Sequence, residues 1–232
     1  MDVFARIDEA RRECNVLEHP FYRRWSAGEL SAEELGFYAG EYRHAVVALA
    51  TVSDRAAAKV GAEHRAGLKR HAAEEHSHIA LWDEFARAAG EQVAGTLEVL
   101  DGAGERPSPR KPLAETERCA QVWGEGENAL EHLAVLYAIE ASQPEIAETK
   151  LAGLVERYGY SPEGPAVEYF QLHSTLDIEH ARQARELIEQ LMSEEQAEAQ
   201  EQAERMVARA TAALHANWTL LDGVDREFAP VS

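Results

Sequence analysis

Cysteine is scarce in this sequence. Of the 232 residues only two are cysteines, Cys14 and Cys119, and they form no C-x-x-C pair. Two isolated cysteines do not indicate a disulfide framework, so the expected location is a reducing cytoplasm. The first residues, MDVFARIDEARREC, also lack the charged and then apolar pattern of a signal peptide.

Basic residues are also few relative to acidic ones. The chain has 23 lysine and arginine residues against 42 aspartate and glutamate residues, a formal net charge of −19. A surface this acidic repels phosphate backbones and anionic lipids, so neither a nucleic acid nor a membrane is an expected partner. No apolar run approaches the roughly 18 residues that a membrane-spanning helix requires.

Strand-like alternation of apolar and polar residues is nearly absent, and alanine, glutamate, leucine and arginine dominate, which predicts an all-α protein. Ser31 and Glu34 form a capping-box pattern, and Asn128 is expected to restart a helix that Gly124 and Gly126 weaken. No linker divides the chain, so we expect one helical domain over residues 1–232 with a loop rich in glycine and proline at 101–112. The seven predicted helices cover about 2–17, 31–60, 62–89, 113–143, 144–158, 161–192 and 194–221.

The segment YFQLHSTLDIEHA, residues 169–181, carries three potential metal ligands. His173, Asp177 and His180 have the spacing i, i+4 and i+7, which places them within roughly 60° of one another on a helix. Burying such groups without partners costs several kcal/mol, by a rough estimate, and a metal ion would compensate that cost. The competing interpretation is a solvated, salt-bridged helix face, since Glu179 and Arg182 flank the stripe.

A second candidate motif lies in HAAEEHSHIALW. Glu75 and His78 are i, i+3 and Glu74 and His78 are i, i+4, so either carboxylate can share a helix face and a metal with His78. Dinuclear carboxylate sites in helical bundles use a Glu-x-x-His motif. His71 lies on the same side and is expected as an outer partner of a ligand, whereas His76 points elsewhere. The alternative is a histidine-rich exposed helix.

Glu140 is the third candidate. It follows the apolar run LAVLYAI, which is expected in the core, and a carboxylate there needs either a metal or an arginine as its partner. The combined set of carboxylates and imidazoles suits two iron or manganese ions with open positions for dioxygen, and it is too rich for one structural zinc. The set consists of Glu74 or Glu75, His78, Glu140, His173, Asp177 and His180.

These spacings, together with LEHPFYRRWSAGEL and YAIEASQPEIAETKLAGL, resemble the heme-oxygenase-like dimetal oxidases of the TenA/PqqC superfamily. The resemblance is strongest to the p-aminobenzoate synthases typified by the chlamydial protein associating with death domains, and it covers nearly the whole chain. It implies a seven-helix fold and a centre of Fe/Fe or Mn/Fe that activates dioxygen with electrons from an external reductant.

The resemblance also implies a self-sacrificing reaction that yields p-aminobenzoate, a folate precursor. The tyrosine that supplies the aromatic skeleton matches Tyr22, the lysine implicated as amino donor matches Lys150, and a further family tyrosine matches Tyr169. Without the resemblance, a half-buried core tyrosine is expected at position 22 and a surface lysine at position 150.

The chain departs from this family at two points. The family usually has several more residues between its first glutamate and histidine, so the compact EEHSH leaves Glu74 and Glu75 as alternatives. Ile139 stands where the relative has a tyrosine, and if that tyrosine relays electrons or radicals, Tyr137, Tyr42 or Trp82 would have to replace it.

Other functions remain as alternatives. A dimetal oxidase of the same fold can act on a free small molecule, such as an amino or fatty acid, rather than on its own side chains. A PqqC-like oxidase and a non-catalytic interaction protein are further possibilities. A TenA-like hydrolase is disfavoured because no nucleophilic cysteine lies between residues 128 and 142. The resemblance suggests a homodimer.

Overall fold

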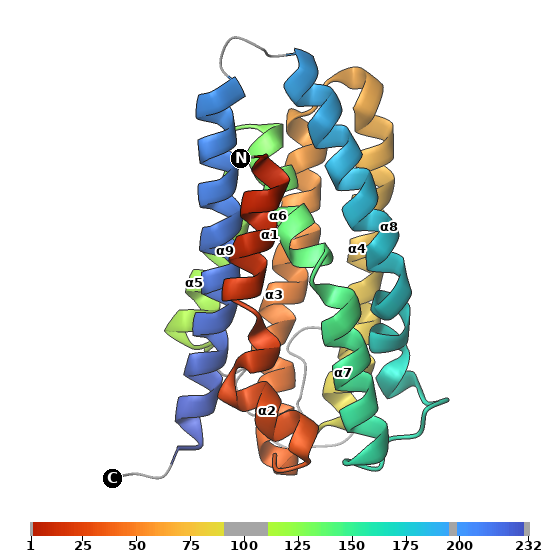
Figure 1. The fold of residues 1–232 in the computed structure, drawn as a ribbon. Helices are drawn as coiled ribbons and strands as arrows, with labels where there is room; N and C mark the ends of the chain where they lie inside the picture. Colours follow the sequence, from red (N-terminus) through yellow and green to blue (C-terminus); the bar gives the residue numbers. More distant parts are fainter. Residues whose placement is uncertain (1, 91–110, 195–198, 230–232) are drawn as a thin grey trace.

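The computed structural model describes residues 2–90, 111–194 and 199–229, and within these ranges it contains helices and no strands. The all-α class predicted from the sequence is therefore confirmed. Nine α-helices and one 3-10 turn are present among the described residues (Figure 1). They are α1 (Val3–Glu13), η1 (Val16–Glu18), α2 (Pro20–Ala27), α3 (Ala32–Lys59), α4 (Ala62–Ala88), α5 (Ala114–Gly124), α6 (Ala129–Glu140), α7 (Gln143–Glu156), α8 (Pro165–Glu194) and α9 (Ala199–Glu227).

Capping hydrogen bonds confirm two of the predicted helix starts. At the start of α3, Glu34 N donates to Ser31 Oγ at 3.1 Å and Ser31 N donates to Glu34 Oε2 at 2.7 Å. At the start of α6, Glu131 N donates to Asn128 Oδ1 at 3.0 Å. Both caps satisfy backbone N–H groups that the first helical turn leaves without partners.

The number of helical segments exceeds the predicted seven for two local reasons. The connector after residue 18 is itself helical, because Pro20 begins α2 and the ring of His19 accepts a hydrogen bond from Phe21 N at 3.1 Å. The fourth predicted helix is two helices, α5 and α6, since α5 ends at Gly124 and Asn128 caps a new start. The predicted loop at 101–112 falls almost entirely outside the described residues.

The centre of the molecule is the short helix α6, which is buried along its whole length. It packs against α3, α8 and α9, while α4 packs against α3 and α8 (Figure 1). A polar side chain on the inner faces of α4, α6 and α8 is therefore shielded from water and must find its partners within the protein.

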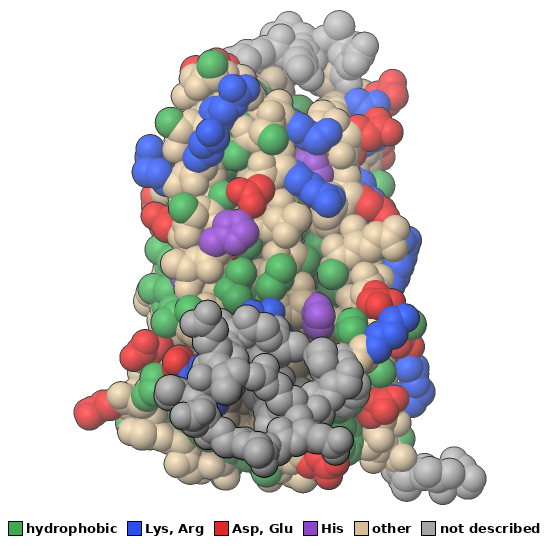
Figure 2. Space-filling model, turned by 180° about the vertical axis from the view of Figure 1, so that it is seen from behind, with side chains coloured by type: hydrophobic (Ala, Val, Ile, Leu, Met, Phe, Trp, Pro, Cys, Tyr) green, Lys and Arg blue, Asp and Glu red, His purple; other side chains and the backbone are tan. Residues whose placement is uncertain are grey.

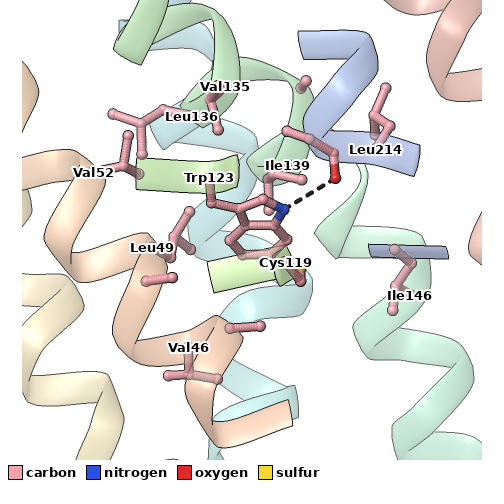
Figure 3. Close-up of a cluster of buried hydrophobic side chains, with 14 of the residues drawn as sticks. Val46, Leu49, Val52, Cys119, Trp123, Val135, Leu136, Ile139, Ile146 and Leu214 are labelled. Carbon is pink, nitrogen blue, oxygen red and sulfur yellow. Dashed lines mark hydrogen bonds between the residues drawn. The ribbon is translucent and has the colours of Figure 1, made fainter. Parts of the chain in front are cut away.

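One side of α6 packs into a hydrophobic cluster with α3, α5 and α9. Figure 3 shows Trp123 of α5 in this cluster, with Leu49 of α3 and Leu136 of α6 beside it. The indole Nε1–H of Trp123 donates to the carbonyl oxygen of Ala213 on α9 at 3.0 Å. This packing fixes the position of α6 relative to α3 and so the position of the residues that α6 presents on its other side.

The surface intersperses acidic, basic and apolar side chains on the face seen in Figure 2. Among the described helices, none is both long enough and apolar enough to cross a membrane.

Helices α2 and α7 approach closely at Gly153, and this contact gives a stability prediction. A Cβ at Gly153 would lie 2.6 Å from Cδ1 and Nε1 of the fully buried Trp25 ring. Replacing Gly153 with alanine should therefore destabilise the protein by about 1–3 kcal/mol, as overpacking a core does. Unfolding in urea, followed by circular dichroism, measures the change.

Gly67 of α4 is the matched control, because a Cβ there would meet only Arg70 Nη2, at 3.9 Å. Replacing Gly67 with alanine should stabilise the protein by about 0.5–1 kcal/mol through helix propensity alone. Equal stabilisation by both substitutions would mean that the Trp25 ring does not pack on Gly153.

Candidate metal centre

Two stripes of polar side chains face each other across α4 and α8. Both follow the spacing i, i+4 and i+7, which keeps three side chains on one helix face. The two stripes lie alongside each other and run in opposite directions. The rings of His71 and His180 have centroids 4.3 Å apart, and those of His78 and His173 have centroids 4.7 Å apart. The stripe on α4 is His71, Glu75 and His78, and the stripe on α8 is His173, Asp177 and His180.

The structure distinguishes the two carboxylates that the sequence left as alternatives. Glu75 is 2% exposed, and its Oε1 lies 3.3 Å from His78 Nδ1 and 3.5 Å from His180 Nδ1. The side chain of Glu74 is 55% exposed, and its Oε2 reaches only the outer side of the centre, 3.3 Å from His180 Nε2. Glu75 is thus the carboxylate that α4 directs between the stripes.

Helix α6 contributes Glu140, its last residue, which is fully buried. Its Oε1 lies 2.8 Å from His71 Nε2. The carbonyl end of a helix carries partial negative charge, which disfavours a second negative charge at that position. No arginine pairs with Glu140 among the described residues, so the arginine alternative finds no support, and the imidazole of His71 is the nearest group that can compensate its charge.

The residues from the three helices form two overlapping groups, each with ligand atoms within 4.8 Å of one another. Glu75 belongs to both groups, so its carboxylate lies where it can bridge two ions. Asp177 is fully buried beside them, with Oδ1 3.6 Å from His180 Nδ1. One group consists of His71, Glu75, Glu140 and His180, and the other consists of Glu75, His78 and His173.

The ring of His173 is held in a defined orientation. Its Nδ1 lies 2.6 Å from the carbonyl oxygen of Tyr169, to which Nδ1–H donates, so the lone pair of Nε2 points into the centre. The ring of Tyr169 stacks on that of His173, with centroids 3.9 Å apart and planes 23° apart. A backbone acceptor on one ring nitrogen and a free lone pair on the other is the arrangement that metal-binding histidines adopt.

Unsatisfied polar atoms are concentrated at this centre. Glu140 Oε2, both oxygens of Asp177 and Nε2 of His173 are buried and have no hydrogen-bond partner. Buried polar groups are almost always hydrogen-bonded, so such a cluster needs another partner. The donor set of imidazoles and carboxylates fits two first-row divalent ions such as iron or manganese.

The pKa values of the residues in the centre are shifted by burial and by the neighbouring carboxylates and imidazoles. Burial lowers the pKa of His180, but Asp177 and Glu75 outweigh this effect and raise it to about 11. Burial also raises the pKa of Asp177. The pKa of Glu75 is lowered because the imidazoles of His180 and His78 outweigh the effect of burial. Metal ions would take over the charge compensation that protons provide here, so their binding must release protons.

Lys150 of α7 lies in a separate buried cluster of aromatic side chains. It is 2% exposed, and its Nζ is 4.6 Å from the ring centroid of Tyr42 and 4.9 Å from that of Tyr22. No carboxylate pairs with Lys150 among the described residues, and burial lowers its pKa to about 7. The surface lysine and half-buried tyrosine expected without the resemblance are wrong, since Tyr22 is only 1% exposed.

Ring contacts connect the aromatic cluster around Lys150 with the metal centre. From Tyr169, which stacks on His173, Trp82 lies 4.9 Å away and Tyr42 lies 5.2 Å beyond Trp82, between ring centroids. Tyr22 joins through Tyr38, whose hydroxyl is 2.7 Å from that of Tyr22.

The three possible substitutes for the relative's tyrosine differ in whether they belong to this line of rings. Tyr42 and Trp82 belong to this line of rings, with centroids 5.2 Å apart. Tyr137 lies elsewhere, because its hydroxyl donates to Asp8 Oδ1 at 3.0 Å and its ring packs against Phe4.

His71 lies closer to the candidate ligands than the sequence predicts. It was expected as an outer partner, but its Nε2 lies in the same group as Glu75 and Glu140. The signal was present in the sequence, because His71, Glu75 and His78 repeat the H-x3-[DE]-x2-H spacing of the stripe on α8.

Comparison with known proteins agrees with this geometry. The family model described as "Iron-containing redox enzyme" matches residues 36–215, which include every residue of the two groups. The chain is similar to the 4-aminobenzoate synthase of Chlamydia muridarum, with 32% identity over 82% of this chain and 79% of the relative. It is also similar to the 4-aminobenzoate synthase of Nitrosomonas europaea, with 28% identity over 96% of this chain and 91% of the relative.

Solved structures match the fold over almost the whole chain. A heme-oxygenase-like domain of unknown function from Shewanella denitrificans has a TM-score of 0.73 at 19% identity, covering 98% of this chain and 94% of that one. The TenA homologue of P. horikoshii has a TM-score of 0.72 at 14% identity, covering 97% and 99%. The heme-oxygenase-like fold is thereby confirmed, and the chain is an oxidoreductase that belongs to the family of iron-containing redox enzymes.

Proposed function

We propose that this protein is an oxygen-activating dimetal oxidase that makes 4-aminobenzoate from its own Tyr22, with Lys150 as the source of the amine. The family and the names of the similar synthases support an oxidase of this kind. The proposal further includes an Fe/Fe or Mn/Fe centre, dioxygen as co-substrate and an external reductant.

The observation that carries the proposal is the burial of Lys150 among aromatic rings. A lysine amine is rarely buried without a carboxylate, and here it lies against the faces of Tyr22, Tyr42 and other aromatic rings. Its pKa of about 7 gives the neutral, nucleophilic amine a large population near neutral pH. An amine donor and an aromatic acceptor are thus held in contact in a water-poor space.

The chain's own residues prepare the metal centre for its role. Two bound redox metals would activate dioxygen, which is the oxidant. His71, Glu75, Glu140 and His180 would hold one ion, and Glu75, His78 and His173 the other, with Asp177 beside them. The Tyr169 carbonyl fixes His173, and the line of rings from Tyr169 to Tyr38 offers a path for electrons from Tyr22.

The product's structure defines what must happen to Tyr22. 4-Aminobenzoate has a nitrogen where tyrosine has its phenolic oxygen and a carboxyl group where tyrosine has Cβ. The bond between Cα and Cβ must therefore break, and dioxygen must be the oxidant that converts Cβ to the carboxyl group. Nζ of Lys150 must condense with the oxidised ring, which releases the phenolic oxygen as water, and hydrolysis of the Cε–N linkage would then leave an aldehyde at position 150. The hydroxyl oxygen of Tyr38, 2.7 Å from that of Tyr22, can accept the phenolic proton of Tyr22 during oxidation.

A second candidate function, oxidation of a free small molecule, is favoured by one residue. Ile139, where the resembling synthases have a tyrosine, is buried and aliphatic and cannot relay an electron. In that case turnover would leave Tyr22 intact.

Reconstitution tests the proposal. Metal-free protein is loaded anaerobically with Fe²⁺ or with Mn²⁺ and Fe²⁺, and then receives dioxygen and a reductant. We expect at most one 4-aminobenzoate per chain, with mass changes confined to the peptides that contain Tyr22 and Lys150. Protein labelled with ¹⁵N-lysine should transfer the label to the product.

Two tyrosine variants serve as controls. Tyr22→Phe should form no 4-aminobenzoate, whereas Tyr38→Phe should still form it more slowly, because it removes only a hydrogen-bond partner. Modification of Tyr42 instead would reassign the source, since its ring is as close to Lys150. Repeated turnover of an added substrate with Tyr22 unmodified would establish the second candidate.

A further inference from the structure

A surface cleft lies between the first turns of α4 and the last third of α8. It has a volume of about 390 Å³. Its inner wall is apolar, with Leu68, Leu133 and Ala184, and its rim is polar, with Glu63 and Gln190 among the residues that line it. Helices α4 and α8 lie side by side along this region (Figure 1).

The cleft ends at the metal centre. Of the residues in the two ligand groups, His71 alone lines this cleft within the described part of the chain. His71 is 8% exposed, and its Nε2 lies 2.8 Å from Glu140 Oε1 and 3.7 Å from Glu75 Oε1. A solute in the cleft is therefore separated from the inner carboxylates by one imidazole ring.

The absence of a side chain at Gly67 keeps the cleft open. Gly67 lies in the interior of α4, one turn before His71, where glycine weakens a helix. It does not have a positive φ, and a Cβ there would meet no atom closer than Arg70 Nη2, at 3.9 Å. Neither backbone conformation nor close packing requires glycine at this position. The remaining effect of glycine here is that no side chain obstructs the cleft.

The rim presents ligands suited to a divalent cation. Glu63 and His64 lie at the start of α4, with Glu63 Oε1 3.8 Å from His64 Nε2, and Glu186 faces them from α8. The side chains of Glu63 and Glu186 are 64% and 53% exposed, and Glu186 Oε1 is paired with the equally exposed Arg182 of the same helix, so both carboxylates remain in contact with water. Arg70 also lines the cleft, but the chain as a whole carries a net charge of −19 and attracts cations.

We propose that this cleft is the route by which Fe²⁺ or Mn²⁺ reaches the centre, with Glu63, His64 and Glu186 as transient ligands and His71 as the residue that transfers the ion inward. The inference rests on the proposed metal centre. The competing route passes Glu74, which is exposed and lies 3.3 Å from His180 Nε2 on the outer side of the centre.

The rate of metal uptake tests the route without reference to catalysis. Metal-free protein is mixed anaerobically with Fe²⁺, and uptake is followed by competition with a chromogenic ferrous chelator. Gly67→Phe should slow uptake by about tenfold or more, since a charged cleft that focuses ions raises association rates by at least that factor. The amount of iron bound at saturation should not change.

Matched variants separate the route from general effects. Gly67→Ala should load at the wild-type rate, and so should Ala88→Phe, which adds the same ring on α4 at a different cleft. Glu63→Gln should slow uptake and weaken its dependence on salt, because a steering charge is lost. Glu74→Gln should leave the rate unchanged.

A labelling experiment blocks the cleft after the protein has folded. Gly67→Cys can be compared before and after reaction with a bulky maleimide, because Cys14 and Cys119 are buried. Slower uptake after labelling supports the route. Uptake at the wild-type rate in both Gly67→Phe and the labelled protein overturns it, and a slow Glu74→Gln would then identify the other route. Wild-type protein that binds no iron at all overturns the metal centre itself, which the same titration reveals first.

Discussion

Replacing Glu75 with glutamine is expected to remove metal from both positions of the centre. Glu75 is the one residue common to the two ligand groups, and glutamine keeps its size while removing the charge that binds and bridges two cations. The loss of affinity should exceed the roughly 10–100-fold that follows removal of an outer partner of a ligand. Elemental analysis after anaerobic loading with Fe²⁺, with circular dichroism to verify folding, measures the effect.

Glu74→Gln is the natural comparison, because the two carboxylates are neighbours on the same helix. Within the described part of the chain, the carboxylate of Glu74 pairs with the outer nitrogen of His180 alone, so its loss should reduce affinity by no more than about tenfold and leave the number of bound ions unchanged. The reverse result, with metal lost in Glu74→Gln and retained in Glu75→Gln, would mean that α4 is rotated relative to the arrangement described here.

The sequence predicted the α8 stripe because helical periodicity is a local property. His173, Asp177 and His180 share a face in any regular helix, and whether that face meets water or other ligands is the only open question. The caps at Ser31 and Asn128 were predictable for the same reason, since each depends on side chains within three residues of the helix start.

The choice between Glu74 and Glu75 was not predictable in this way. Both are within reach of His78 along the helix, and only the rotation of α4 against α8 decides which one is buried. That rotation depends on packing between residues about one hundred positions apart. The proximity of His71 to Glu140 was not predictable for the same reason, because a different helix supplies Glu140.

Lys150 shows the limit of composition and periodicity. Lysine is among the residues least often buried, so the sequence alone predicts a surface position, and only the family resemblance singled it out. The aromatic rings around it come from α2, α3, α4 and α8, and no local pattern in the sequence brings them together.

Replacing Lys150 with methionine is expected to stabilise the metal-free protein at neutral pH. Burial lowers the pKa of Lys150 from 10.5 to about 7, so between these values the unfolded chain binds a proton that the native chain does not. This destabilisation is fully present below the native pKa and disappears as the pH rises through the unfolded one. At pH 7 it amounts to on the order of 4 kcal/mol, and at pH 9 to about 2 kcal/mol.

The stability difference between Lys150→Met and wild type should therefore shrink by about 2 kcal/mol between pH 7 and pH 9, as measured by urea unfolding. Lys69→Met, at an exposed position on α4, should show no such change. A difference that stays constant with pH would mean that Lys150 remains charged in the native protein. The same result would weaken its assignment as amine donor, because only the neutral amine has a lone pair with which to attack an oxidised ring.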